Sequence, residues 1–447
     1  MKSKSSAVKQ SELRPKIILR SRLPILWLAL LLFAALFLPS RVWNTLLIGL
    51  AGLVGIAYIW IRQVSNGLHG KRQLRFGWVA VGDRLSEQFE IHNSSRLPAI
   101  WVEVVDQSTV PGYRADVVRS IPFNTTNSWR QSAICIRRGH FRLGPWHLRT
   151  SDPFGIFFAT IPLHQRDEII IHPPVHSQIP IPLPTGQSLG RARGRLRSWQ
   201  ATISATGIRD YQPQDPRNWI HWPTTARRSE LSTRLFDLDA AGDIWLLLDM
   251  QAAVQVGIDA EGTEEHTVLL AAALSAQALR RNRAVGLAAY GTEPLIIPPS
   301  RSHGQQWKLL RALALVKSDG ENDLSLSMRD VRRMVSKGSS AVVITPSDSA
   351  GWLPDLLQLA NRGVSCSVLL LNRSSFASEN ETPIKGNLGL QDSIQRLGFR
   401  CYTINQGDIG IPTEDLERRG FWEFKVTGTG KVIATRNPFA GTSPMPK

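Results

Sequence analysis

The chain has 447 residues, a formal net charge of +17, three cysteines and 43% hydrophobic residues. This length accommodates two or three domains, and the ordinary Gly, Pro and charge contents exclude a fibrous or a wholly disordered protein. Cys135, Cys366 and Cys401 are too few and too scattered for a disulfide framework, which excludes a small secreted scaffold and favours a reducing compartment.

The positive charge is concentrated in two short segments. Residues 1–75 carry twelve Lys and Arg against one acid, and residues 191–234 carry nine Arg against three acids. The segments 76–190 and 235–447 are nearly neutral, with net charges of +1 and −1. A generally basic surface is therefore excluded, and nucleic-acid binding becomes an unlikely function.

Residues 23–61 predict two transmembrane helices. Two uncharged apolar runs, 23–38 and 42–61, are separated by three residues, and the second has the length that a bilayer core requires. Trp27, Trp43 and Trp60 stand near the ends of the runs, where interfacial aromatic residues are common. A signal peptide and a buried hairpin of a soluble core are the alternatives.

The flanking charges orient this hairpin. Residues 1–22 form a basic N-terminus, and more basic residues follow the second run, whereas only Arg41 lies between the two runs. The positive-inside rule then places the N-terminus and all later domains in the cytoplasm of a multi-pass protein of the cell membrane.

Residues 76–174 predict an antiparallel β-sandwich. Short runs with alternating apolar residues, such as LSEQFEIHN and AIWVEVVD, are bounded by Gly, Pro, Asn and Ser. The string DPFG at residues 152–155 is typical of a turn, and we expect Phe154, Phe157 and Phe158 to be core residues.

Residues 175–237 combine a Pro-rich linker with an Arg-rich segment. The arginines of GRARGRLRS, Arg191 to Arg197 at every second residue, would share one side of an extended chain and suit phosphates, lipid headgroups or an acidic protein. A solvated basic loop is the simpler interpretation. The following residues 207–237 are dense in charges and aromatics, and they admit three interpretations: a buried polar network, a binding surface, or an acid–base pair of Asp210 or Asp215 with His221.

The strings RRGHFRLGPWHLRTSDPFGIF and GIRDYQPQDPRNWIHWPTTARRSELSTRLFD closely resemble the two signature regions of the domain-of-unknown-function 58 family, and with the flanking segments the resemblance covers nearly the whole chain. Gln214 and Pro223 depart from the family pattern. The residues that carry the resemblance are also the candidate signature or interaction residues: Arg209, Tyr211, Asp215, Arg217, His221, Trp222 and Arg227.

Residues 238–436 predict an α/β domain, and residues 437–447 predict a disordered tail. Buried strands at 243–249, 284–290, 341–345, 367–371 and 401–404 alternate with helical stretches at 264–281, 305–316, 353–361 and 390–397. This alternation indicates a mostly parallel sheet covered on both faces. Ligands of such sheets bind at the carboxyl ends of the strands, which points to Asp249 and to residues 345–348.

The family resemblance implies a von Willebrand factor type A-like fold, whose Mg²⁺ site uses Asp-x-Ser-x-Ser with a later Thr and Asp. Here the loop reads Asp249, Met250, Gln251, Ala252, Ala253, so both serine ligands are replaced, and Asp348 is the candidate for the later acid. Because Mg²⁺ demands hard oxygen ligands in near-ideal geometry, we expect a degenerate site with weakened or no metal binding. Otherwise Asp249 caps the following loop.

We therefore expect a membrane-anchored, non-enzymatic scaffold that docks protein partners on the cytoplasmic face. The resemblance implies a MoxR-type AAA+ ATPase as a partner, with a role in protein assembly or at the envelope. The alternative is a metal-assisted hydrolase using Asp249, Asp348 and His221, for which no nucleophile elbow, phosphate-binding loop or paired-cysteine metal motif is present in the sequence.

Overall fold

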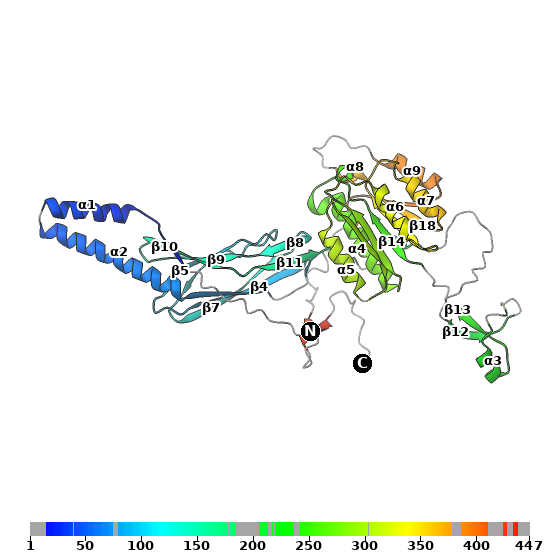
Figure 1. Cartoon of the computed structure of the whole chain (residues 1–447), viewed down its shortest axis with the longest axis horizontal. Helices are drawn as coiled ribbons and strands as arrows, with labels where there is room; N and C mark the ends of the chain where they lie inside the picture. Colours follow the sequence, from blue (N-terminus) through cyan, green and yellow to red (C-terminus); the bar gives the residue numbers. More distant parts are fainter. Residues whose placement is uncertain are drawn as a thin grey trace. The chain divides into compact units, whose positions relative to one another are not determined.

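The computed structural model divides into two compact units, Met1–His172 with Thr413–Lys447 and Pro173–Pro412. The residues that it describes are 15–38, 40–74, 79–176, 179, 181–184, 205–212, 217, 220–236, 242–302, 304–377, 386–409, 423–426 and 432–436. Several sheets and a set of helices make it a mixed α/β structure, and each unit is described by itself (Figure 1).

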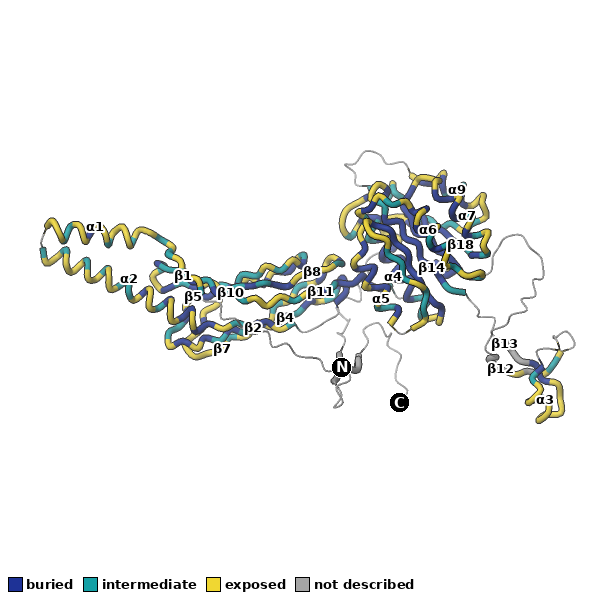
Figure 2. Tube along the Cα trace, viewed as in Figure 1, coloured by how far each residue is buried: buried dark blue, intermediate teal, exposed yellow. Residues whose placement is uncertain are grey.

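Two apolar helices open the first unit. Helix α1 spans Leu23–Phe37 and helix α2 spans Arg41–Gly67, with the Ser40 hydroxyl accepting a hydrogen bond from the Val42 N–H at the start of α2. Both helices are largely exposed (Figure 2) although most of their residues are apolar. By length and composition α2 alone among the described helices is able to cross a membrane, since α1 is shorter.

The remainder of this unit consists of short β-strands around one hydrophobic core. The strands are β1 (Lys16–Leu19), β2 (Leu68–Leu74), β3 (Val79–Ala80), β4 (Arg84–Asn93), β5 (Ala99–Asp106), β6 (Val117–Ile121), β7 (Thr125–Ile134), β8 (Gly139–Leu143), β9 (Trp146–Ser151), β10 (Phe157–Leu163) and β11 (Asp167–His172). They form sheets in the orders β1-β10-β9-β5-β6, β2-β4-β7 and β3-β11-β8, antiparallel except for β3 with β11. The predicted alternating strands of this segment are confirmed, and β4 buries every second residue.

The DPFG string forms the turn between β9 and β10. The buried Asp152 carboxylate accepts hydrogen bonds from the N–H groups of Phe154 (2.9 Å) and Phe157 (2.6 Å), and Gly155 has a φ of 69°. Phe157 and Phe158 are half-buried, but Phe154 is 54% exposed. The prediction that Phe154 is a core residue is therefore wrong, because the Asp152 hydrogen bonds fix a tight turn and leave its tip outside the core.

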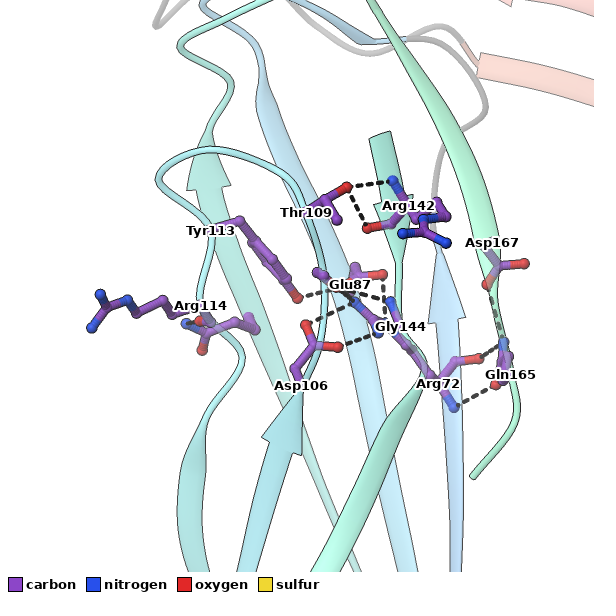
Figure 3. A network of polar contacts seen from close by, with 12 residues as sticks. Arg72, Glu87, Asp106, Thr109, Tyr113, Arg114, Arg142, Gly144, Gln165 and Asp167 are labelled. Carbon is purple, nitrogen blue, oxygen red and sulfur yellow. Dashed lines mark hydrogen bonds and ion pairs between the residues drawn. The ribbon is translucent and has the colours of Figure 1, made fainter. Parts of the chain in front are cut away.

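A buried guanidinium joins three parts of the β-rich unit (Figure 3). Arg72 on β2 forms a two-pronged ion pair with Glu87 on β4, with Nε–Oε1 and Nη2–Oε2 distances of 2.8 and 2.6 Å. Its Nη1 also reaches Asp106 Oδ1 at the end of β5 (2.9 Å), and Nη2 donates to Ser108 Oγ (3.0 Å). The Tyr113 hydroxyl donates to Glu87, so both carboxylates bind the one cation and Glu87 also accepts from a hydroxyl.

The ionisation of this cluster follows from these contacts. Burial alone lowers the pKa of Arg72, but the hydrogen bond and charge of Glu87, with the charge of Asp106, reverse that effect and raise it. Burial and the negative charge of Glu87 raise the pKa of Tyr113. Arg72 thus stays charged and Tyr113 stays neutral, as a satisfied buried ion pair requires.

The second unit contains a six-stranded sheet in the order β16-β15-β14-β17-β18-β19. Its strands are β14 (Ile244–Leu248), β15 (Val285–Tyr290), β16 (Pro294–Ser300), β17 (Ser340–Thr345), β18 (Ser365–Leu371) and β19 (Arg400–Ile404). All neighbours are parallel except the edge strand β16, which is antiparallel to β15. Numbered along the chain, the order is 3-2-1-4-5-6, so the direction of winding reverses between β14 and β17.

Helices cover both faces of this sheet (Figure 1). Helices α4 (Thr263–Arg280) and α5 (Gln305–Leu315) contact strands on one face, and α6 (Leu324–Met334), α7 (Leu353–Asn361) and α9 (Leu388–Arg396) share a core with Trp245, Leu247 and Val343 on the other. The predicted alternation of strands and helices is confirmed. The sequence analysis missed β16, α6 and the short helix α8 (Arg373–Phe376): prolines interrupt β16 and α8 is a single turn, whereas α6 shows a helical spacing in Leu324, Met328 and Val331 that could have revealed it.

Two antiparallel strand pairs complete the described chain. Strands β12 (Ala205–Asp210) and β13 (Ser232–Phe236) pair around helix α3 (Trp222–Arg228), and β20 (Glu423–Val426) pairs with β21 (Val432–Arg436). The predicted Arg191 to Arg197 stretch and the 437–447 tail lie outside the described residues.

The substitution Arg72→Met tests the buried ion pair. Removing the guanidinium leaves Glu87 and Asp106 buried without their cation, so we expect a loss of about 3–5 kcal/mol in the free energy of unfolding of the first unit. The measurement is denaturant unfolding of the full-length chain in detergent, followed by near-UV circular dichroism.

The matched control is Arg149→Met, which removes the exposed ion pair with Glu103 (3.4 Å) on neighbouring strands. We expect it to cost less than about 1 kcal/mol, because solvent screens an exposed pair. Equal losses in the two variants would contradict the special role of Arg72.

Candidate functional site

Asp249 and Thr345 meet at the reversal point of the six-stranded sheet. In the parallel register of β14 and β17, Leu248 lies opposite Ile344, so the residues that follow these strands emerge side by side. The Thr345 hydroxyl donates to Asp249 Oδ2 at 2.6 Å, and the Gln251 N–H donates to Oδ1 at 3.3 Å. The prediction that Asp249 lies at the carboxyl edge, where such sheets bind ligands, is thus supported by its geometry.

The neighbouring loop is fixed to the same residue. Gln255 Nε2 donates to the main-chain oxygen of Asp249 at 2.9 Å, and Gln255 Oε1 accepts from the Thr263 hydroxyl at the first residue of α4 (2.7 Å). Thr345 Oγ1 also accepts from the Ser347 N–H (2.9 Å). Hydroxyl and amide groups therefore link Asp249 to the loop after β14 and to the loop after β17. This agrees with the expectation that Asp249 caps the loop that follows β14.

Asp249 is buried, and among the described residues no basic side chain forms an ion pair with it. Burial, with a smaller contribution from the charge of Asp323, outweighs the hydrogen bonds from Thr345 and Gln251 and raises the pKa of its carboxyl to about 6. A raised pKa of this kind marks candidate functional sites, because a fold rarely keeps an uncompensated buried acid.

The described residues do not assemble a Mg²⁺ site around Asp249. Asp348 is exposed and forms an ion pair with Arg373 (3.2 Å). Throughout the described ranges no group of three or more His, Cys, Asp and Glu side chains is placed to hold a metal ion. One carboxylate whose two oxygens already accept hydrogen bonds does not fit the octahedral demands of Mg²⁺.

The signature segment folds as a strand pair that carries a short helix. In the β12–β13 pair, Asp210 lies opposite Ser232 and Ile208 opposite Arg234, and Ile220 forms an isolated bridge with Thr233. Ile220, Ser232 and Thr233 are buried, whereas helix α3 buries none of its residues. The segment therefore presents α3 outward, with Arg227 and Arg228 in its last turn.

His221 caps helix α3. The ring Nδ1 accepts from the main-chain N–H of Thr224 (3.3 Å) and lies 2.8 Å from the Thr224 hydroxyl. The main-chain N–H of His221 donates to the Ser232 carbonyl (2.8 Å). Because Nδ1 accepts from a main-chain donor, the ring proton of a neutral His221 lies on Nε2. The geometry gives His221 a structural role, and in the described part of the chain no hydrogen bond or ion pair joins it to Asp249 or Asp348.

The other signature residues occupy different environments. Trp222 is 64% exposed, Arg217 and Arg227 are exposed, and Tyr211 is half-buried with its N–H bonded to the Leu231 carbonyl (2.8 Å). Asp215 and the side chain of Arg209 lie outside the described residues. The exposed tryptophan and arginines favour the binding-surface interpretation over a buried polar network.

The sequence analysis missed Arg283. This arginine binds the main chain at Pro184 and Gly242, on the two sides of the signature segment. Its guanidinium donates to the Pro184 carbonyl (2.6 Å), to the Gly242 carbonyl (2.7 Å) and to Ser340 Oγ (3.1 Å). Burial lowers its pKa, and the charge of Asp243 opposes that effect. In the sequence Arg283 belongs to the basic run RRNR, so no local pattern distinguishes it from arginines that are exposed to solvent.

The substitution Asp249→Asn tests the buried acid. The pKa of the Asp249 carboxyl is about 6 in the folded protein and 3.8 ordinarily. Above pH 6 the ionised carboxylate therefore lowers the free energy of unfolding by its full amount. Below pH 4 the carboxyl is protonated in both states and this destabilisation disappears. At pH 7.5 we expect the variant to be more stable by roughly 2–3 kcal/mol, the difference between the two pKa values converted at 1.36 kcal/mol per unit.

Thermal unfolding of the wild type and Asp249→Asn between pH 4 and 8 provides the measurement. The gap between the two melting curves should close as the pH falls. A wild type that is the more stable protein at pH 7.5 would show that a bound group compensates the carboxylate, and added Mg²⁺ then identifies or excludes a divalent cation.

Comparison with known proteins finds a family model that matches the signature segment and most of the following α/β part. A family model described as "Protein of unknown function DUF58" matches residues 207–405. The chain is 25% identical over 322 residues to "Uncharacterized protein YeaD" of Bacillus subtilis, covering 70% of this chain and 77% of that protein. It is 27% identical over 192 residues to "Uncharacterized protein Rv1480" of Mycobacterium tuberculosis, covering 41% of this chain and 58% of that one.

Similarity to solved structures is slight. The CARDB domain of a Pyrococcus furiosus protein aligns with 24% of this chain and 91% of its own length at 8% identity, with a TM-score of 0.18, which carries no argument about the fold. The family match begins at Gly207, where the signature segment begins, and ends after β19. Over residues 207–405 the chain is therefore similar to the DUF58 family, and the resemblance inferred from the signature motif is confirmed for that part.

Proposed function

We propose that this protein is a membrane-anchored, non-enzymatic scaffold whose cytoplasmic units dock other proteins. The observation that carries the proposal is the outward presentation of the signature segment: α3 buries no residue, and Trp222, Arg227 and Arg228 are exposed on it. An exposed tryptophan beside arginines is the composition of energetically dominant positions in protein interfaces.

Anchoring in the membrane rests on the two apolar helices. We propose that α1 and α2 form a two-helix transmembrane hairpin, since both carry exposed Leu and Ile side chains, and α1 also exposed Phe side chains, that water does not favour. Basic residues lie before α1 and after the apolar part of α2, which places the N-terminus and both units in the cytoplasm under the positive-inside rule.

The two units serve as rigid modules in this proposal. We interpret the sheets of the first unit as a β-sandwich, because they share one core and most of their strands pair antiparallel. We interpret the second unit as a von Willebrand factor type A-like domain, in keeping with its 3-2-1-4-5-6 sheet and with Asp249 at the carboxyl edge.

The partner that we propose is a MoxR-type AAA+ ATPase, acting with this protein in the assembly of other proteins or at the envelope. This choice comes from the resemblance to the DUF58 family, while the exposed surface of α3 supplies the place for docking. The alternative function, a metal-assisted hydrolase using Asp249, Asp348 and His221, predicts stoichiometric metal that is lost in Asp249→Ala.

The double substitution Trp222→Ala with Arg227→Glu tests the docking surface. We expect it to abolish recovery of the AAA+ ATPase with the tagged full-length protein from detergent-solubilised membranes in the presence of ATP. Truncation of a central aromatic or arginine commonly costs about 2 kcal/mol or more of binding, a loss of roughly thirtyfold in affinity. Mass spectrometry of the recovered proteins provides the measurement.

The matched control is Leu315→Ala, an exposed apolar residue on α5 away from the signature segment in sequence. It should leave recovery unchanged, and neither variant should shift the melting temperature, because the altered side chains are exposed. Undiminished recovery in the double variant would reject α3 as the docking surface, and absence of any ATPase with the wild type would reject the partner.

A further inference from the structure

One end of the β-rich unit is attached directly to helix α2. Strand β2 begins at Leu68 immediately after α2, and Leu68 lies opposite Asn93 of β4, which lies opposite Thr125 of β7. The Ser94 N–H donates to the Gly67 carbonyl (2.8 Å). The turn after β4 and the turn before β7 therefore lie beside the end of α2.

The DPFG turn lies at this same end. The Arg20 N–H donates to the Ile156 carbonyl (2.9 Å), and α1 begins three residues later at Leu23. The ring of Phe157 contacts that of Tyr58 on α2, with 5.7 Å between centroids. The turn that carries Phe154 is thus level with the start of α1 and with the final third of α2.

Because the β-rich unit packs against the last part of α2, a shorter stretch of this helix is available to contact lipid. The side chains of Ala57, Ile61 and Val64 on α2 are buried by the unit's own packing. Residues 42–56 then provide about 22 Å of unobstructed helix, and the 15-residue α1 has the same length. A hydrocarbon core measures about 30 Å, so a hairpin spanning it falls short by roughly 8 Å.

Because a bilayer thins around a short span, the end of the unit from which the helices emerge is drawn against the headgroups, and its chemistry suits that layer. The tips of two turns expose Phe123 (61%) and Phe154 (54%), and Arg20, Arg22 and Arg96 are exposed around them. Asp152 is buried as an acceptor inside its turn. Within the described residues 94–98, 122–124 and 153–155 no aspartate or glutamate occurs. Aromatic rings with arginines and no acids are typical of the headgroup layer of an anionic membrane.

We propose that this end of the first unit, the proximal face defined by Arg20, Arg22, Arg96, Phe123 and Phe154, is a lipid-binding surface that enters the headgroup layer of the bilayer. The aromatic tips lie among the headgroups, and the guanidiniums bind anionic lipid phosphates. The inference rests on the proposed membrane anchoring of α1 and α2. It gives the DPFG turn a function, which is to hold the β-rich unit against the membrane surface at a fixed depth.

Depth-dependent fluorescence quenching tests this proposal on the full-length protein. Single cysteines replace Phe154, Phe123, Ile136 and Ile48, one in each variant, and each is labelled with the fluorophore NBD in a Cys401→Ser background. The native Cys135 and Cys366 can stay, because both are buried and burial raises the pKa of each thiol to about 12, which leaves little reactive thiolate. The vesicles contain phosphatidylcholine and phosphatidylglycerol with a nitroxide on the headgroup or at mid-chain.

Ile136 is the matched control for the proximal face. It is 55% exposed, like Phe154, but follows the opposite end of β7, where Ile134 lies across from Arg84. Strand β4 from Arg84 to Asn93 separates the two ends by about 30 Å at 3.3 Å per residue. Ile48, 72% exposed on α2, reports insertion of the helix itself.

We expect labels at 154 and 123 to lose most of their emission to the headgroup nitroxide, the label at 48 to the mid-chain nitroxide, and the label at 136 to neither. Quenching at 123 keeps the test decisive if the Phe154 variant does not fold. If 154 and 123 behave like 136 while 48 is quenched, the lipid-binding surface is rejected and the membrane anchor stands. If 48 is not quenched either, both the anchor and this surface are rejected.

Discussion

A charge removed from water must be compensated where it lies, and the two units meet this constraint in different ways. In the first unit the Arg72 guanidinium pairs with Glu87 and Asp106, so a single cation ties strands β2, β4 and β5 together at the end of the core. Tyr113 adds its hydroxyl to the same cluster. With every charge paired, the cluster is suited to a rigid support and offers no group for chemistry.

In the second unit the compensation is incomplete at one residue. Asp249 receives a hydroxyl and a main-chain N–H but no cationic side chain from the described residues, and burial holds its pKa well above the ordinary value. This buried carboxylate lies where the direction of winding of the sheet reverses, which is the place where ligands of such sheets bind. Arg283 is likewise buried without a hydrogen-bonded carboxylate, and it uses its donors to join the carbonyls at the two ends of the signature excursion. The six-stranded sheet thus carries the exposed signature segment, and Arg283 fixes the main chain on both sides of it.

The helices and the strands of the first unit form one mechanical element. Because β2 follows α2 without a linker and Tyr58 contacts Phe157, a force on the helices is transmitted directly to the sheets. Gly67 permits this junction, since a Cβ there would lie 2.6 Å from the main-chain nitrogen of Ser95.

The sequence by itself determined the apolar helices, the alternating strands, the parallel α/β pattern and the similarity of residues 207–405 to the DUF58 family, because each depends on local periodicity or on a contiguous motif. It also located Asp249 at the end of a buried strand. Only the tertiary structure decided that Phe154 points outward, that His221 caps a helix, that Asp348 pairs with Arg373, and that Arg72 and Arg283 are buried. Arg72, Arg283 and Asp348 find their partners 15 to 99 residues away in the chain, whereas the Phe154 turn and the His221 cap depend on hydrogen bonds to residues two and three positions away. Composition and spacing do not encode which of several arginines or acids will lose its water.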